Sequence, residues 1–209
     1  MKILAIGAHP DDIELGCSGT VALCNLKGYT TYFLVLSLGE KGGDPKIRKQ
    51  EAIKSSKVLG IKKLFFGNLQ DTKIGNNITT ISMIEKIINK VRPDIVLTHS
   101  SKETHQDHRN TALSTFSAAR NVSTILSYES PSNLQFFSPQ LFICINRTID
   151  LKLKALKVFT SQANKDYLEI DAVLGLAKFR GYAAKAKFAE AYEVVRIIIS
   201  DESGLKLIV

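Results

Sequence analysis

The sequence predicts an α/β fold, a three-layer Rossmann-like sandwich in which helices flank a mostly parallel sheet. Short β-branched or aromatic segments alternate with longer helical segments through residues 2–98. The chain has 209 residues, of which 44% are hydrophobic and 23% charged, and this composition excludes a disordered, collagen-like or disulfide-scaffold protein. We find no repeat, low-complexity tract or linker, and therefore expect one domain over residues 1–209.

The first half of the chain divides into regular strand and helix segments. Gly28 is a suitable C-cap for the first helix, and Arg92-Pro93 ends the third. Three glycines make residues 37–45 a loop between the second strand and second helix. The expected strands are 2–7, 30–36, 63–66 and 94–98, and the expected helices are 12–27, 47–59 and 78–91.

The second half is less regular. Prolines 131 and 139 mark a loop between two short apolar segments, and a late β-branched segment follows the last helical pattern. The expected helices are 111–121, 149–159 and 171–187, and the expected strands are 125–128, 141–145 and 192–199.

Composition limits the partners and the compartment. The formal charge of +8 suits an anionic substrate, but the lysines are scattered without interleaved aromatic residues, so we expect no nucleic-acid partner. No apolar run reaches the roughly 18 residues that span a bilayer, which predicts no transmembrane segment. The N-terminus does not resemble a secretory signal, and three cysteines without a C-x-x-C pair fit a reducing cytoplasm.

Chemistry-bearing residues gather after two of the predicted strands. The four histidines, at positions 9, 99, 105 and 108, all follow the first or the fourth strand, and Asp11, Asp12 and Asp107 accompany them. In a doubly wound sheet, ligands bind beyond the carboxyl ends of the strands. Imidazole and carboxylate together suit a divalent metal, chiefly zinc. An isolated histidine is usually only hydrogen-bonded, but two such clusters at one sheet edge predict a metal site.

The spacing leaves the ligand set open. His9 and Asp12 lie one helical turn apart and can face the same side, which leaves Asp11 pointing elsewhere. Either His105 or His108 could be the third ligand. Three protein ligands leave a position for water, while a free carboxylate and a free imidazole can serve as base and as oxyanion stabiliser or acid.

Two motifs carry a resemblance to a known family. The segment 7–16, Gly-Ala-His-Pro-Asp-Asp-Ile-Glu-Leu-Gly, resembles the A-H-P-D-D-x-E signature of the zinc-dependent N-acetylglucosaminyl-phosphatidylinositol de-N-acetylases, also called LmbE-like or PIG-L. Residues 105–110 resemble the second motif of that family, H-x-D-H. Weaker matches extend the resemblance over most of the chain: Gly39-Glu40, Arg48 with Glu51, Ser161-Gln162, Arg180-Gly181 and residues 182–190.

The resemblance implies a role for each site residue. It implies His9, Asp12 and His108 as ligands of Zn²⁺, with another divalent ion such as Fe²⁺ as a second choice. Asp11 would be the general base, and His105, oriented by Asp107, would stabilise the oxyanion or donate a proton. Arg48 and Asp71 would bind the substrate. His99 has no family role and is expected to be structural, and Tyr128 is left without a role.

The resemblance therefore predicts zinc-dependent hydrolysis of the N-acetyl group of an N-acetylglucosamine-type sugar conjugate, and the charge of +8 suits an anionic conjugate. The resemblance also implies a homo-oligomer. One alternative is a non-haem iron oxygenase with a His9-x-Asp11 and distant histidine triad, which requires Asp11 as ligand. A second alternative is a non-catalytic nucleotide- or sugar-binding α/β module.

Overall fold

A computed structural model of the chain describes residues 1–198. Its seven strands form one sheet in the order β3-β2-β1-β4-β5-β7-β6. Strands β1 to β5 are parallel, and β7 is antiparallel to both β5 and β6. The strands are β1 (Lys2–Gly7), β2 (Thr30–Ser37), β3 (Lys63–Leu69), β4 (Ile95–Thr98), β5 (Thr124–Tyr128), β6 (Leu141–Cys144) and β7 (Ala189–Ile197).

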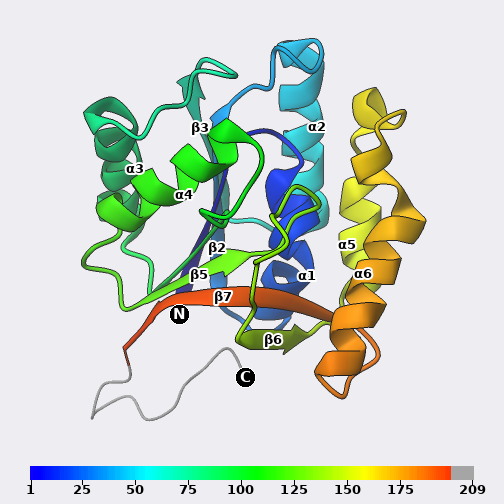
Figure 1. Cartoon of the computed structure of the whole chain (residues 1–209). Coiled ribbons are helices and arrows are strands. Elements are labelled where there is room, and N and C mark those ends of the chain that lie inside the picture. The colour runs from blue at the N-terminus through cyan, green and yellow to red at the C-terminus, as the bar shows by residue number, and fades with distance from the viewer. Residues whose placement is uncertain (199–209) are drawn as a thin grey trace.

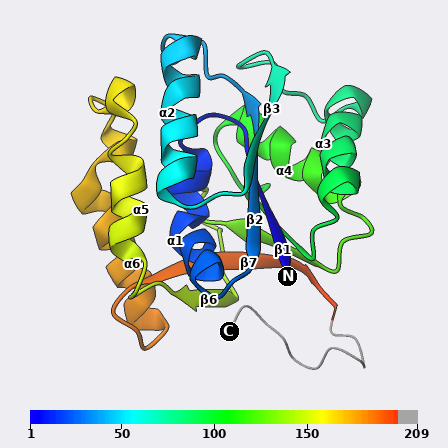
Figure 2. The same cartoon turned by 180° about the vertical axis from the view of Figure 1, so that it is seen from behind.

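Helices cover both faces of the sheet, as Figures 1 and 2 show from opposite sides. Helices α3 and α4 pack together on one face, and α1, α2, α5 and α6 cover the other. The predicted three-layer α/β sandwich is confirmed. The helices are α1 (Asp12–Leu26), α2 (Pro45–Val58), α3 (Ile78–Val91), α4 (Gln106–Ala118), α5 (Ile149–Leu156) and α6 (Ile170–Ala183), with short 3-10 turns at Thr160–Gln162 and Asp166–Leu168.

Alternation along β1 divides the hydrophobic core in two. Ile3 and Ala5 pack into the core beneath α1, whereas Leu4 and Ile6 pack into the core beneath α3 and α4. Successive side chains of a strand point to opposite faces, so a strand that is covered on both faces must be apolar throughout. This explains why the first strand reads as a continuous hydrophobic run.

The strand order places a switch point between β1 and β4. The chain moves outward from β1 to β2 and β3, and then returns to the other side of β1 to form β4 and β5. At such a point the loops after the two central strands diverge, leaving a crevice at their carboxyl ends. The His9 and His99 segments leave the sheet at this crevice.

Several element bounds differ from the prediction. Helix α4 begins at Gln106 instead of residue 111, because the Nδ1 atom of His105 accepts a hydrogen bond from the amide of Asp107 and caps the helix. Helix α6 ends at Ala183 and not at 187, and β7 already begins at Ala189. The last residue of the expected strand 192–199 lies outside the described residues, as does the end of the expected domain 1–209.

Within residues 1–198, none of the helices combines the length and the hydrophobicity that crossing a bilayer requires.

Candidate metal centre

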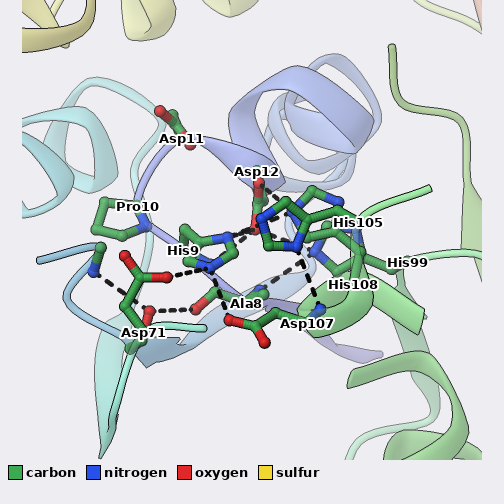
Figure 3. Close-up of polar contacts among 12 residues, drawn as sticks. Ala8, His9, Pro10, Asp11, Asp12, Asp71, His99, His105, Asp107 and His108 are labelled. Atoms are coloured by element: carbon green, nitrogen blue, oxygen red, sulfur yellow. Dashed lines mark hydrogen bonds and ion pairs between the residues drawn. The ribbon is translucent and has the colours of Figure 1, made fainter. Parts of the chain in front are cut away.

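Three potential ligands converge at the crevice between β1 and β4 (Figure 3). The Nδ1 atom of His9 lies 3.3 Å from Nε2 of His108 and 3.4 Å from an oxygen of Asp12. The Nε2 atom of His108 lies 3.4 Å from the other Asp12 oxygen. His9 is in the loop after β1, Asp12 starts α1, and His108 is in the first turn of α4. The structure thus brings together the three residues that the resemblance implies as ligands.

Neighbouring donors also form overlapping groups in which one potential ligand atom per residue lies within 4.8 Å of the others. These groups are His9 with His105 and His108, Asp12 with His99 and His108, and His9 with Asp71 and Asp107. The crevice therefore offers more potential ligand atoms than a single ion uses. The contacts made by the second nitrogen of each imidazole distinguish one candidate ligand from another.

Two carboxylates lie behind His9. Its Nε2 atom is 3.0 Å from Asp71 and 3.2 Å from Asp107. The amide of Lys41 donates to Asp71 at 2.9 Å, and the amide of Thr72 donates to Asp107 at 2.7 Å. Both acids are therefore anchored by the backbone, and both can accept the Nε2 proton of His9. This leaves Nδ1 directed toward Asp12 and His108.

A carboxylate that the sequence analysis missed lies behind His108. An oxygen of Glu103 is 3.4 Å from Nδ1 of His108, and the Glu103 side chain is fully buried. The hydroxyls of Ser130 and Ser132 each donate to Glu103, which joins the loop after β5 to the segment that precedes α4. Glu103 belongs to an irregular segment between β4 and α4 without any periodic or motif signal, so only the tertiary structure could find it.

The environment of His105 favours its neutral form. Burial and the neighbouring charges of His108 and His9 lower the pKa of its imidazole below the usual value. Because Nδ1 accepts the amide proton of Asp107, the single proton of the neutral ring lies on Nε2. Asp107 thus orients His105 through its backbone amide, while its carboxylate contacts His9 and not the His105 ring.

Asp11 faces away from the imidazole cluster in Figure 3. Its Oδ2 atom accepts hydrogen bonds from Arg48 at 3.0 Å and from the hydroxyl of Tyr167 at 3.2 Å. The backbone of Asp11 is left-handed, with φ 99°, an uncommon conformation for a side-chain-bearing residue that is found at functional sites. Burial raises the pKa of Asp11 to about 7, although the charge of Arg48 opposes the shift.

The guanidinium of Arg48 forms several hydrogen bonds within the protein. It donates to the carbonyl of Pro10 at 2.6 Å and to the carbonyl of Gly39 at 3.3 Å, besides contacting Asp11. Arg48 therefore fixes the segment that carries Asp11. Both Arg48 and Asp71 line the cavity described below. The substrate contacts expected for these two residues stay predictions.

His99 and Tyr128 support the site from beneath. The Nε2 atom of His99 lies 3.1 Å from Asp12 and 3.2 Å from the amide of Ala8, and its ring stacks on His108 with centroids 4.0 Å apart. Tyr128 is fully buried, and its hydroxyl donates to the carbonyl of Ile6 at 2.9 Å. Neither residue is among those that line the cavity described below.

The centre carries an excess of buried negative charge. Asp11, Asp12, Asp71, Glu103 and Asp107 are each less than 9% exposed, and Arg48 is the buried guanidinium among them. Burial lowers the pKa of His108, but the charges and hydrogen bonds of Asp12 and Glu103 together outweigh this effect and raise the pKa to about 9. Imidazoles surrounded by carboxylates in this way favour a bound cation.

A cavity of about 370 Å³ opens above these residues. His9, Asp11, Asp12, His105 and His108 line its floor, and Lys41 and Lys165 are exposed lining residues. The cavity is large enough for a small-molecule substrate. It brings together the predicted ligands, Asp11 and His105 on one concave surface.

The comparison with known families identifies the family of the chain and the class of activity of that family. Residues 4–119 match the family model described as PIG-L, GlcNAc-PI de-N-acetylase. The chain belongs to this family. The resemblance expected from the two sequence motifs is thus confirmed, and PIG-L family members of this description are deacetylases, which hydrolyse amides.

Individual proteins similar to the chain include deacetylases and a hydratase. The chain is 37% identical to the uncharacterized deacetylase YaiS of Escherichia coli over 74% of this chain and 88% of YaiS. It is 27% identical to diacetylchitobiose deacetylase of Thermococcus kodakarensis, covering 93% of this chain and 83% of that enzyme. The fold also matches the crystal structure of 4-carboxy-2-hydroxymuconate hydratase from Pseudomonas putida, with TM-score 0.84, 21% identity, and coverage of 96% and 98%.

Proposed function

We propose that this PIG-L family protein is a metal-dependent deacetylase that removes the acetyl group from an N-acetylglucosamine-type sugar conjugate. The observation that carries the proposal is the convergence of His9, Asp12 and His108, with donor atoms 3.3–3.4 Å apart, on the floor of a substrate-sized cavity. The family description and the diacetylchitobiose deacetylase support the choice of an N-acetylated sugar.

The donor spacing fits zinc. Tetrahedral Zn²⁺ with ligands at about 2.0–2.1 Å places neighbouring ligand atoms about 3.3 Å apart. His9 and His108 offer two imidazole nitrogens 3.3 Å apart, and each nitrogen lies 3.4 Å from a different oxygen of the Asp12 carboxylate. A bound metal of this kind makes a coordinated water more acidic and polarises a carbonyl oxygen. Zinc is therefore the proposed metal, with Fe²⁺ as the second choice.

The carboxylates behind the rings favour His9 and His108 over His99 as ligands. Metal-binding histidines almost always donate their second N–H to a carboxylate, carbonyl or water. His9 has Asp71 and Asp107 behind it, and His108 has Glu103. Among residues 1–198, the Nδ1 atom of His99 has no hydrogen-bond partner, and Glu103 lies farther from it, at 3.8 Å, than from His108. We accordingly propose that Asp71 and Asp107 orient His9 and that Glu103 orients His108. Asp71 keeps its predicted substrate contact as well.

Asp11 is the proposed general base. Arg48 and Tyr167 hold its Oδ2 atom, so Oδ1 remains to take a proton from the attacking water. A carboxyl whose pKa is about 7 is well matched to proton transfer near neutral pH. His105 has its Nε2 proton available to stabilise the oxyanion or to protonate the leaving amine.

The iron oxygenase alternative is not favoured. That mechanism requires Asp11 as a ligand, but Asp12 is the acid beside His9 and His108, and Asp11 contacts Arg48 and Tyr167. Membership of an enzyme family likewise disfavours a non-catalytic binding module. A single functional domain, a homo-oligomer, a cytoplasmic location and an anionic substrate remain part of the proposal.

An acetate-release screen tests the proposed function. Purified protein is incubated with N-acetylglucosamine, N,N′-diacetylchitobiose and phosphorylated N-acetylglucosamine conjugates, with and without added Zn²⁺. We expect zinc-dependent release of acetate and a free amine in equal amounts. Consumption of a substrate without acetate release, as in a hydratase, would contradict the proposal, and so would acetate release that persists after complete metal removal.

A further inference from the structure

A second cavity of about 180 Å³ adjoins the catalytic one. Its lining residues come mainly from α1, α6 and the start of β7. Helix α6 packs against β7, as Figure 1 shows. Leu15, Pro131 and Tyr167 line both cavities. The two cavities therefore meet at these three side chains, which places the second cavity beside the proposed metal centre.

Small side chains create the hollow. Ala177 projects from α6, and Ala189 and Ala191 from β7, and all three are at most 4% exposed. Gly16 faces them from α1 and cannot carry a larger side chain, since a Cβ there would lie 2.1 Å from the ring of Tyr128. Leu15, Val173 and Leu176 complete an apolar wall.

The charged residues of the second cavity are largely satisfied by one another. Lys152 and Glu190 form an ion pair at 2.6 Å, and both side chains are 4% exposed. Arg180 pairs with Glu129 through two hydrogen bonds. The remaining charged lining residue, Asp166, is exposed to solvent. The interior therefore offers no free charge to a polar occupant, and its walls favour an uncharged apolar group.

We propose that the second cavity binds an apolar group of the substrate, up to about six carbons long, while the amide of the same molecule lies at the metal centre. An apolar protein cavity of about 150 Å³ holds a benzene molecule, so 180 Å³ suits a group of this size. The inference rests on the proposed deacetylase function and defines its substrate class. The apolar group is either the aglycone of the sugar or an N-acyl chain longer than acetyl.

Two substrate series distinguish these sources. The first consists of alkyl glycosides of N-acetylglucosamine from methyl to decyl, followed by acetate release. The second consists of methyl glycosides of glucosamine N-acylated with acetyl to octanoyl chains, followed by amine release. In the series that reaches the cavity, we expect kcat/KM to rise up to about fourfold per methylene and to level off near six carbons. The other series should stay flat, and two flat series would overturn the inference.

A variant that fills the second cavity, compared with a matched control, tests whether the dependence on chain length arises in that cavity. Ala172 lines the second cavity from the exposed side of α6, so Ala172→Leu should narrow the cavity without disturbing the core. We expect it to flatten the dependence on chain length. Ala183→Leu makes the same change at an exposed position of the same helix outside the cavity and should retain the dependence. Equal chain-length dependence in both variants would overturn the inference.

A binding measurement separates this inference from the proposed function. Hexyl and methyl β-glucoside, which lack an amide, are titrated into the metal-loaded protein by calorimetry. Tighter binding of the hexyl compound that Ala172→Leu abolishes supports the second cavity even if no substrate releases acetate. Equal binding of both compounds, in a protein that does release acetate, leaves the deacetylase function intact and overturns the second cavity as a binding site.

Discussion

The Nδ1 atom of His9 and the Nε2 atom of His108 lie 3.3 Å apart, although 99 positions separate the two residues. The distance is that of neighbouring ligands on one tetrahedral ion. This short distance arises because β1 pairs with β4 and because α4 begins at Gln106. Together these two features bring the loop after β1 and the start of α4 to one edge of the sheet. Disrupting either histidine should therefore act first on metal binding.

His108→Ala should abolish stoichiometric binding of zinc, because it removes one of three proposed ligands. His105→Ala is the matched control, since it should keep the metal and lose turnover by about 10²–10⁴-fold through the missing proton donor. Elemental analysis of both variants after dialysis, together with kcat, separates these outcomes. Full zinc occupancy in His108→Ala would show that this residue is not a ligand.

Glu103→Gln should weaken metal affinity or activity by about 10–100-fold, because a neutral amide no longer supports the basicity of the His108 ring. Competition with a zinc-binding dye measures the affinity. Glu85→Gln is a suitable control, since Glu85 pairs with Arg120 on the surface, where ion pairs contribute little. If both variants bound zinc as the unaltered protein does, Glu103 would have only a structural role.

Asp11→Asn should retain zinc but reduce kcat by about 10²–10⁴-fold, because asparagine keeps the shape of the base and cannot accept the proton. Zinc content and kcat are measured on the same preparation. Asp44→Asn is the control, because Asp44 caps α2 at an exposed position and asparagine caps helices equally well. A normal kcat in Asp11→Asn would remove Asp11 from the mechanism.

Gly16→Ala should destabilise the fold by about 1–3 kcal/mol, because its Cβ would overlap the buried ring of Tyr128. Thermal unfolding should then show a Tm roughly 2–4 °C lower for each kcal/mol in a chain of this size. Gly175→Ala in α6, where a Cβ meets no atom within 4 Å, should leave Tm unchanged or raise it slightly. Equal Tm values for both variants would contradict the close packing of Gly16 on Tyr128.

The three cysteines should react very differently with a thiol reagent at pH 8. Burial raises the pKa of Cys24 to about 12 and that of Cys17 well above its usual value, so neither forms the reactive thiolate at this pH. Cys144 is exposed. One thiol per chain should react rapidly in the folded protein and three after denaturation. Rapid reaction of all three without denaturant would contradict the burial of α1.

Local patterns were sufficient to predict the fold class and to single out most of the residues that we propose to carry the chemistry. The apolar β1 segment, the alternation of strands and helices, and the His-Pro-Asp-Asp motif all reside in short stretches of chain, where periodicity and spacing act directly. The start of α4 was not predicted, because it depends on a cap formed by the side chain of His105, a residue that reads as a ligand candidate.

The amino-acid sequence by itself determined which donors this protein can offer a metal and that they follow the central strands, because those properties depend on residue type and neighbours along the chain. The tertiary structure alone decided which imidazole nitrogen of His9 and which of His108 faces the proposed metal position. That choice is made by Asp71, Asp107 and Glu103, whose carboxylates reach the opposite ring nitrogens across chain separations that no local pattern encodes. The same holds for the second cavity, since its walls come from α1, α6 and β7 and meet only when the sheet is assembled.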